Sequence, residues 1–243
     1  MMKKLVLSAM FLVLLTSFAA AQSKPFKPFC GHCFSGWTAV KSNAVDGWKI
    51  GTVSVSEDGT SFVVNEKVGE KEVPCMVNAL PGNWTQLNPR QGVDFYTDKK
   101  FGDCTVKLEF NITKGSNSGV YLMGEYEVQI ADSFGKPDDK LGQGDMGAIY
   151  SAASPKINAA TAPGTWQTYE IEFVAPKFDE NGKKTANALF KKIVLNGKTV
   201  QENVEVQGPT GGQLSPNESP TGPLMLQGNH GPIAFRNIEI ITP

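Results

Sequence analysis

The chain has 243 residues, with 23 Lys or Arg against 24 Asp or Glu, so its formal net charge is -1. This balance excludes the strongly basic surface through which proteins bind nucleic acid or anionic lipid by charge alone. Its 25 glycines and 15 prolines, with turn signals about every eight to twelve residues, favour many short strands.

The first residues have the pattern of a secretory signal peptide. Two lysines precede the short apolar run 5–18, and three alanines follow it, ending at Ala21. This pattern predicts cleavage after Ala21 and export to the periplasm or the medium. No later stretch is long and apolar enough to span a bilayer. Residues 22–243 are expected to form a single domain.

All four cysteines, Cys30, Cys33, Cys75 and Cys104, follow the predicted cleavage site. In an exported protein, disulfides are the expected state. The run Cys30-Gly31-His32-Cys33 copies a dithiol oxidoreductase motif, but the residues after it lack the helical periodicity that such a site needs. A zinc site would need a distant fourth ligand, and His32 is poorly placed to join the two cysteines. A structural cross-link is the preferred interpretation.

Alternating hydrophobicity and turn signals predict a series of short strands. In chain order they cover 48–55, 61–66, 75–79, 101–112, 165–175, 189–195, 198–206, 223–227 and 233–241. In the strand 101–112, Val106, Leu108 and Phe110 alternate with Lys107 and Glu109, so the two charged residues share a face. If solvent covers that face, they form an ordinary surface ion pair.

The stretch 114–133, KGSNSGVYLMGEYEVQIADS, predicts a β-hairpin with an acid and an amide on one face. These two groups are Glu127 and Gln129, which alternate with apolar residues. Burying a carboxylate and an amide without partners is costly, so we expect this face to line a wet cleft.

The register of this hairpin depends on its turn. A two-residue loop at Gly124-Glu125 would pair Met123 with Tyr126. The apolar face would then hold Tyr121, Met123, Tyr126, Val128 and Ile130, with Glu127 and Gln129 opposite, beside Val120 and Leu122. The alternative is a strand that continues straight through Gly124, which would place Glu125 and Glu127 on one face.

A long loop rich in Gly and Asp follows, from 132 to 150. Three of its glycines spell G-x-G-x-x-G, but no helix follows them, so a dinucleotide site is excluded. Its aspartates are Asp132, Asp138, Asp139 and Asp145. They either gather around a hard cation such as calcium or are simply solvated, and their spacing does not match an EF-hand.

Two residues near the C-terminus are further candidates. His230 lies on a turn between two strands, where it is either an exposed turn residue or a general base, acid or metal ligand. Arg236 lies among apolar strand residues, so its guanidinium either caps the edge of the sheet or reaches a substrate oxygen. The chain contains no G-x-S-x-G, H-E-x-x-H or P-loop motif.

Five long segments between residues 101 and 241 carry a family resemblance. They are SNSGVYLMGEYEVQIADSFG, GAIYSAASPKINA, PGTWQTYEIEFVAPKFDENGK, LNGKTVQENVEVQGPTGG and GPLMLQGNHGPIAFRNIEI. In this order they resemble the bacterial 3-keto-disaccharide hydrolase domain family. The segments FSGWTAV and VDGWKI resemble the start of such domains more loosely, and the Cys30–Cys33 segment does not match the family.

The resemblance implies an all-β fold, a concanavalin A-like jelly-roll sandwich of two antiparallel sheets with a carbohydrate groove on its concave sheet. It also implies action on sugars whose 3-keto group has been installed by a separate, upstream oxidoreductase. A ketone at C3 acidifies the C2 proton, so a base can remove it while the oxygen on C1 leaves, and water adds afterwards. This chemistry does not need the paired carboxylates of ordinary glycosidases.

On this interpretation Glu127 or His230 is the base, and the other, or Glu109, assists the leaving group. The candidates for binding substrate hydroxyls or the enolate oxygen are Gln129, Gln227, Arg236, Lys107, Tyr150 and Asn117. A divalent metal held by Glu127 and His230 is a variant of the same scheme. The alternative functions are a non-catalytic carbohydrate-binding module and a structural protein of the cell envelope.

Overall fold

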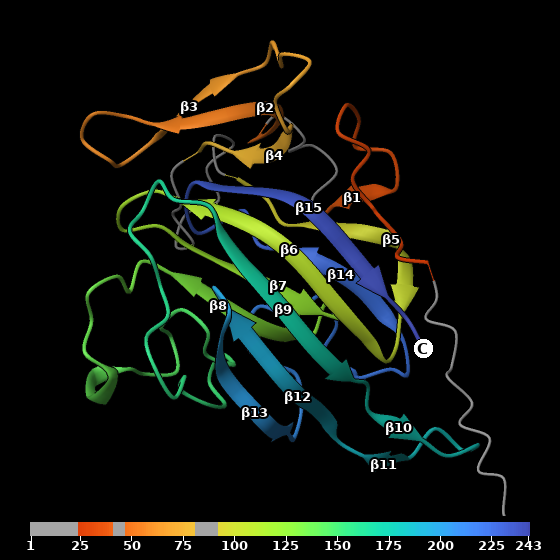
Figure 1. Ribbon diagram of the computed structural model, residues 1–243. Helices are drawn as coiled ribbons and strands as arrows, with labels where there is room; N and C mark the ends of the chain where they lie inside the picture. Colours follow the sequence, from red (N-terminus) through yellow and green to blue (C-terminus); the bar gives the residue numbers. More distant parts are fainter. Residues whose placement is uncertain (1–23, 41–46, 81–91) are drawn as a thin grey trace, which may run out of the picture.

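The computed structural model describes residues 24–40, 47–80 and 92–243 (Figure 1). Nearly all of its elements are strands, with a short 3-10 turn, η2 (Asp138–Lys140), among them. The predicted signal peptide, residues 1–21, lies outside the described residues. Within the described ranges, no helix has the length and apolar character needed to cross a membrane.

Two antiparallel sheets pack face to face (Figure 1). The five-stranded sheet has the order β1 (Trp37–Ala39), β5 (Phe95–Phe101), β14 (Gly222–Leu226), β7 (Asn117–Leu122) and β8 (Tyr126–Ala131). The eight-stranded sheet has the order β13 (Lys198–Val206), β12 (Ala188–Leu195), β9 (Gln167–Val174), β6 (Cys104–Ile112), β15 (Ile233–Ile241), β4 (Cys75–Asn78), β2 (Trp48–Val55) and β3 (Phe62–Asn65). A short hairpin joins β10 (Lys177–Phe178) to β11 (Lys184–Ala186). The predicted jelly-roll sandwich of two antiparallel sheets is confirmed.

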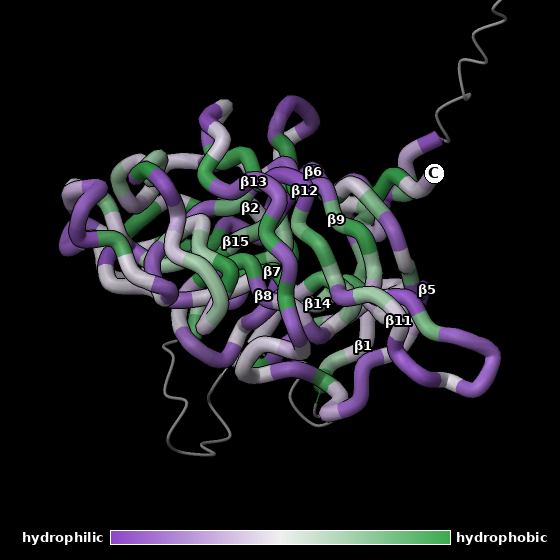
Figure 2. The backbone as a smooth tube through the Cα atoms, turned by 90° about the horizontal axis from the view of Figure 1, so that it is seen from below, coloured by the Kyte–Doolittle hydropathy of each residue, from purple (hydrophilic) through white to green (hydrophobic). Residues whose placement is uncertain are grey.

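The core lies between the sheets and follows the alternation of the strands. On β6, Val106, Leu108 and Phe110 are buried and face the core. On β9, Tyr169 packs on Phe110 with ring centroids 4.8 Å apart. Figure 2 shows hydrophobic stretches in the central strands and hydrophilic ones in the outlying loops. Burying apolar surface stabilises a fold by about 25 cal/mol per Å², so this interface is the main source of stability.

Several strands have the predicted bounds, and others do not. The prediction is correct to the residue for β2, β13 and β15. The single strand predicted for 101–112 is wrong at its start, because β5 ends at Phe101 and β6 begins at Cys104. The strands β1 and β5 were not predicted. The outer part of β5 carries three exposed polar residues, Asp98, Lys99 and Lys100, which hide the alternation of its buried residues.

The cysteines are only partly paired. Cys30 and Cys33 form a disulfide, as expected. Cys75 and Cys104 are free and buried, so the expectation of disulfides is wrong for them. Cys75 packs with Val77 and Ala234 in a small cluster separate from the main core, whereas Cys104 belongs to the main core. Because the two thiols lie in separate clusters, they cannot meet, and burial raises the pKa of each to about 12.

The Cys30–Cys33 segment is a bend rather than the start of a helix. This bend lacks the helix N-terminus that lowers the pKa of a catalytic thiol in dithiol oxidoreductases. The ligand atoms of Cys30, His32 and Cys33 all lie within 4.8 Å of one another. The expectation that His32 is poorly placed to join the two cysteines is therefore wrong. The disulfide nevertheless occupies both sulfur atoms.

Candidate functional site

The hairpin at the centre of the site has a longer turn than predicted. Its loop contains three residues, Met123–Glu125, because Leu122 pairs directly with Tyr126. Met123 and Gly124 both adopt the left-handed conformation, with φ angles of 59° and 68°. The chain reverses here, so the alternative of one straight strand through Gly124 is wrong. The predicted pairing of Met123 with Tyr126 is wrong as well.

This register changes which side chains share a face. Tyr121 lies opposite Glu127, so it leaves the predicted apolar face and joins the acid and the amide. The core face holds Val120, Leu122, Tyr126, Val128 and Ile130. The prediction that Glu127 and Gln129 project away from this apolar face is confirmed.

The face of β7 and β8 that points away from the core is the floor of a pocket of about 320 Å³. Its lining residues are Asn117, Tyr121, Glu127, Gln129, Tyr150, Gly211, Gly212, Gln227 and His230. The structure thus brings together six of the nine predicted site residues, from β7, β8, the turn after β14 and the loop after β8. Tyr121, Gly211 and Gly212 were not predicted.

Glu127 is a buried carboxyl on the pocket floor, only 2 % exposed. Burial raises its pKa from an ordinary 4.5 to about 8, a hydrogen bond with Tyr121 lowers it, and the nearby charge of Asp94 raises it. The side chain lies across Gly119, where an added Cβ would be 2.8 Å from the carboxyl carbon of Glu127. Near pH 7, Glu127 is therefore mostly protonated and able to donate a proton.

This raised pKa makes stability depend on pH. Between pH 6.5 and 8 the folded protein retains the Glu127 proton that the unfolded chain has released, so the free energy of unfolding falls as pH rises, by about 1.4 kcal/mol per unit for one such group. Burial also raises the pKa of Glu125, to about 7. We expect wild-type protein to lose stability across this window. Urea unfolding at pH 6.5, 7.25 and 8 should show a shallower loss in Glu127→Gln, and an identical slope would contradict the assignment.

His230 is held by a rigid turn between β14 and β15. The carboxylate of Asp94 accepts hydrogen bonds from the N–H groups of Gly228, at 2.9 Å, and of Asn229, at 3.3 Å. The Asn78 amide donates to the carbonyl oxygens of Gly228 and Gly231. These contacts fix the turn from both sides of its backbone. Sequence reasoning missed both Asp94 and Asn78, because each lies far from the turn in the chain.

The imidazole itself is half-buried at the rim of the pocket. Its Nδ1 atom forms a short contact with the side-chain oxygen of Asn229. Burial lowers the pKa of His230 below its usual value of 6.5. At neutral pH His230 is therefore uncharged and able to accept a proton.

Two amides complete the floor of the pocket. The side-chain N–H of Gln129 donates to the carbonyl oxygen of Gly144 at 3.2 Å, and that of Gln227 donates to the Tyr121 hydroxyl at 3.1 Å. The amide oxygens of Gln129 and Gln227 are buried and have no hydrogen-bond donor among the described residues. Such acceptors are costly to leave unpaired, so they favour a ligand rich in hydroxyl donors.

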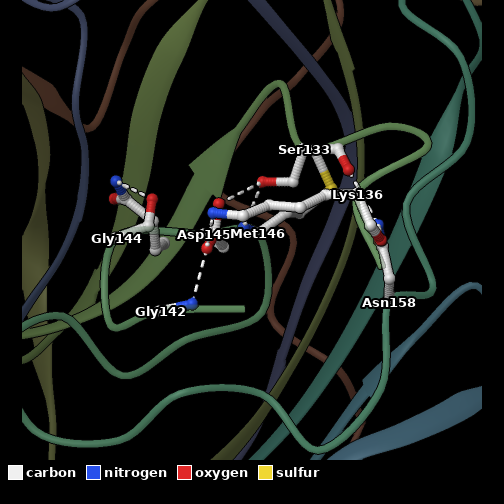
Figure 3. A network of polar contacts seen from close by, with 8 residues as sticks. Ser133, Lys136, Gly142, Gly144, Asp145, Met146 and Asn158 are labelled. Atoms are coloured by element: carbon white, nitrogen blue, oxygen red, sulfur yellow. Dashed lines mark hydrogen bonds and ion pairs between the residues drawn. The ribbon is translucent and has the colours of Figure 1, made fainter. Parts of the chain in front are cut away.

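The loop 132–146 supports this side of the pocket through a polar network (Figure 3). Asp145 accepts hydrogen bonds from Lys136 Nζ and the Gly142 N–H, each at 2.6 Å, and from Ser133 Oγ at 3.1 Å. The Asp145 carboxylate is thus engaged by protein donors rather than free for a cation. The network fixes the segment that presents Gly144 to Gln129.

We expect Asp145→Ala to lower the free energy of unfolding by about 1–3 kcal/mol, because it leaves the buried Ser133 hydroxyl and the half-buried Lys136 and Gly142 donors without this acceptor. Asp139→Ala in the same loop is the matched control. Asp139 is exposed and, within the described part of the chain, pairs with Lys140 alone, so its loss should cost less than about 0.5 kcal/mol. Urea denaturation of both variants tests this, and equal losses would mean that the network does not stabilise the loop.

Comparison with known proteins identifies the family of this sandwich. A family profile described as the 3-keto-alpha-glucoside-1,2-lyase-like domain matches residues 27–241. The chain belongs to this family. The resemblance noted from the sequence is thereby confirmed, and the domain is carbohydrate-active and glycosyl-hydrolase-like. No curated protein matches the chain.

This lyase-like domain is also similar to solved structures. A proposed glycosyl hydrolase from Parabacteroides distasonis ATCC 8503 is 28% identical, with a TM-score of 0.61 over 90% of this chain and 83% of that chain. A second one from the same organism is 20% identical, with a TM-score of 0.45 over 84% and 98%. The carbohydrate-binding module CBM66 from Bacillus subtilis is 13% identical, with a TM-score of 0.41 over 84% and 93%.

Three predicted site residues of the lyase-like domain lie outside the pocket. Lys107 and Glu109 on β6 and Arg236 on β15 project from the outer face of the eight-stranded sheet. Arg236 Nε donates to Glu109 at 2.7 Å, and its guanidinium lies 3.9 Å from the Trp166 ring centroid. Lys107 pairs with Glu170 at 3.2 Å. These three residues are therefore separated from Glu127 and His230, because alternation predicts which residues share a face and not which sheet bears it.

The pocket of the lyase-like domain does not gather the ligands of a compact metal site. A compact metal site needs three or more Cys, His, Asp or Glu residues whose ligand atoms lie close together. Within the described ranges, Cys30, His32 and Cys33 form such a group. Glu127 and His230 line one pocket but belong to no such group of three. The proposed chemistry below therefore uses side chains alone.

Proposed function

We propose that this protein cleaves 3-keto-glycosides by removing the C2 proton, eliminating the C1 substituent and adding water. The observation that carries the proposal is that Glu127 and His230 line one pocket, where burial raises the pKa of the carboxyl and lowers that of the imidazole. An acid and a base that are both in the active protonation state near pH 7 suit a concerted elimination.

The side chains then have complementary roles. His230 takes the C2 proton, which the neighbouring ketone has acidified, while Glu127 donates its proton to the departing oxygen on C1. The product of this step is a sugar with a C1–C2 double bond and a free alcohol. In the second step the Glu127 carboxylate takes a proton from water as its oxygen adds to C1, and His230 returns a proton to C2. Both groups regain their starting states.

The unpaired amide oxygens support a sugar as the ligand. Gln129 and Gln227 each hold a buried oxygen without a donor among the described residues, and sugar hydroxyls supply such donors once these side chains turn toward the pocket. Tyr150 lies at the rim with 36% of its surface exposed, where an aromatic ring can pack on the apolar face of a sugar. Asn117 accepts from Gln129 and borders the same pocket.

We expect a bell-shaped pH dependence of kcat/KM. On the acid side, kcat/KM should fall as His230 becomes protonated, because the base must be unprotonated. Since the pKa of His230 is lowered, this fall should lie below pH 6.5. The basic limb reports Glu127, so kcat/KM should fall about tenfold per unit above pH 8. Initial rates on a 3-keto-disaccharide between pH 5 and 10 measure both limbs. A rate that keeps rising through pH 9 would contradict the acid role of Glu127.

The alternative is a carbohydrate-binding module with the same pocket and no turnover, because the unpaired amides and Tyr150 suit binding equally well. Incubation with a 3-keto-disaccharide, following release of the aglycone or glucose, separates the two functions. Wild type should release product, and Glu127→Gln and His230→Ala should release it at least about 100-fold more slowly. Binding in calorimetry without release, in wild type and variants alike, would support the binding module.

The cellular setting follows from the N-terminal pattern. Cleavage after Ala21 would export the single domain 22–243 to the periplasm or the medium. Because a 3-keto group must be installed before elimination is possible, a sugar 3-oxidoreductase would supply the substrate.

A further inference from the structure

Tyr121 is the pocket residue that the sequence pattern placed on the wrong face. It lies on β7 directly opposite Glu127 on β8 and is only 1% exposed. A buried tyrosine hydroxyl needs hydrogen-bond partners. Those partners define what Tyr121 does in the pocket.

The hydroxyl lies at the meeting point of three pocket groups. It donates to the carbonyl oxygen of Gly211 at 2.9 Å and accepts from the Gln227 amide at 3.1 Å. Tyr121 also lies opposite Glu127 across the β7–β8 pair, and hydrogen bonding from Tyr121 lowers the pKa of the Glu127 carboxyl. A Cβ added at Gly212 would lie 2.6 Å from the hydroxyl oxygen. The pocket wall is therefore fitted closely around this one atom.

A tyrosine hydroxyl has a single proton for two acceptors, the Gly211 carbonyl and the Glu127 carboxylate. When Glu127 is protonated, it needs no donor, and Tyr121 can donate to Gly211. When Glu127 is ionised, its carboxylate is the stronger acceptor, because charge-assisted hydrogen bonds are roughly twice as strong as neutral ones. Burial raises the pKa of Tyr121, so Tyr121 retains its proton in both states.

We propose that Tyr121 is a positioning residue that orients the Glu127 carboxyl in the pocket and, once Glu127 has given up its proton, turns its own hydroxyl proton from Gly211 to the carboxylate. The proton received by the leaving oxygen comes from Glu127, and Tyr121 neither gains nor loses one. This role deepens the proposed function and rests on Glu127 acting as the acid.

Other titratable groups lie near Tyr121 and Glu127, and their effects must be distinguished from that of the Tyr121 hydroxyl. Asp94, from the segment before β5, raises the pKa of both Tyr121 and Glu127. Tyr150, from the loop after β8, contributes to the raised pKa of Tyr121. His230 lines the same pocket, and Tyr169 on β9 senses the Glu127 charge. The comparison below leaves all four groups in place.

The test compares Tyr121→Phe with Tyr126→Phe. Tyr126 lies on the same hairpin, is also buried, and donates to a carboxylate, that of Glu218, but it faces the core side of the sheet. Titration of the Glu127 carboxyl carbon by NMR, in protein labelled with ¹³C-glutamate, reports its pKa without any turnover. The Glu127 signal is assigned by its absence in Glu127→Gln.

We expect Tyr121→Phe to raise the Glu127 midpoint by about one pH unit, because the carboxylate loses a donor, and Tyr126→Phe to leave the midpoint unchanged. In kinetics, Tyr121→Phe should lower kcat about tenfold with little change in KM. An unmoved midpoint would overturn the hydrogen bond, and a moved midpoint with unchanged kcat would overturn the positioning role. If wild type shows no turnover, the proposed function fails, while the titration still decides whether Tyr121 orients Glu127.

Discussion

Glu127→Gln is expected to lower kcat/KM on a 3-keto-disaccharide by about 10²- to 10⁴-fold, the usual contribution of a general acid. Glutamine matches glutamate in size and keeps a hydrogen-bonding head, but it has no proton to give to the leaving oxygen. Because the carboxyl it replaces is buried and protonated, the variant should fold normally. Steady-state kinetics, together with a thermal melt, measure both effects.

Glu109→Gln is the matched control for this substitution. Glu109 projects from the outer face of the other sheet, where it accepts from Arg236 and Asn237. Its replacement should leave kcat/KM at the wild-type value and cost at most about 1 kcal/mol of stability, as expected for a partly exposed ion pair. Equal losses of activity in Glu109→Gln and Glu127→Gln would contradict the location of the site.

Gly119→Ala is expected to lower kcat/KM by about 10²-fold without unfolding the protein. The new Cβ would meet the Cγ and carboxyl atoms of Glu127, and this side chain can turn into the pocket that it lines. The fold therefore tolerates the methyl group, but the acid is displaced from its working position, and a shift of about 1 Å can cost this much activity. Kinetics and a melting curve on the same sample measure the two effects separately.

Two other glycines provide controls for Gly119→Ala. A Cβ at Gly208 would meet nothing within 4 Å, so Gly208→Ala should change neither activity nor stability. A Cβ at Gly222 would lie 2.7 Å from the backbone carbonyl carbon of Met123, so Gly222→Ala should destabilise the fold itself. If Gly119→Ala lost stability as Gly222→Ala does, the space at Gly119 would serve the backbone rather than the acid.

Much of the fold could be predicted because alternation directly reports which side chains face a core. On β9, Tyr169, Ile171 and Phe173 are buried, while Thr168 and Glu172 are on the other face. Such a pattern identifies a half-buried strand without any knowledge of its neighbours. It also identified the polar face of the central hairpin, and with it Glu127 and Gln129.

The pairing partners of a strand could not be predicted in this way, because they depend on contacts between distant residues. A loop of two residues and a loop of three use the same sequence around Gly124, yet they differ by one position in register. This difference of one position places Tyr121 in the pocket rather than on the apolar face. Likewise, Glu109 and Glu127 have similar sequence surroundings, and only the order of the strands places them on different sheets.

The supports of the site were also beyond sequence reasoning. Asp94 bonds to a turn that lies more than 130 residues further along the chain. Gly119 resembles any other glycine in a strand until the carboxyl that lies across it is known. Residues that act through geometry rather than through their own chemistry leave no local pattern to recognise.

The central claim is that the pocket performs elimination and hydration through Glu127 and His230. Its most direct test is cleavage of a 3-keto-disaccharide in D₂O, with mass and NMR analysis of the 3-keto sugar released and a blank that measures spontaneous exchange. The predicted result is release by wild type with one solvent deuteron at C2, and release at least about 100-fold slower by Glu127→Gln. Binding without release, or release as fast by Glu127→Gln as by wild type, would contradict the claim.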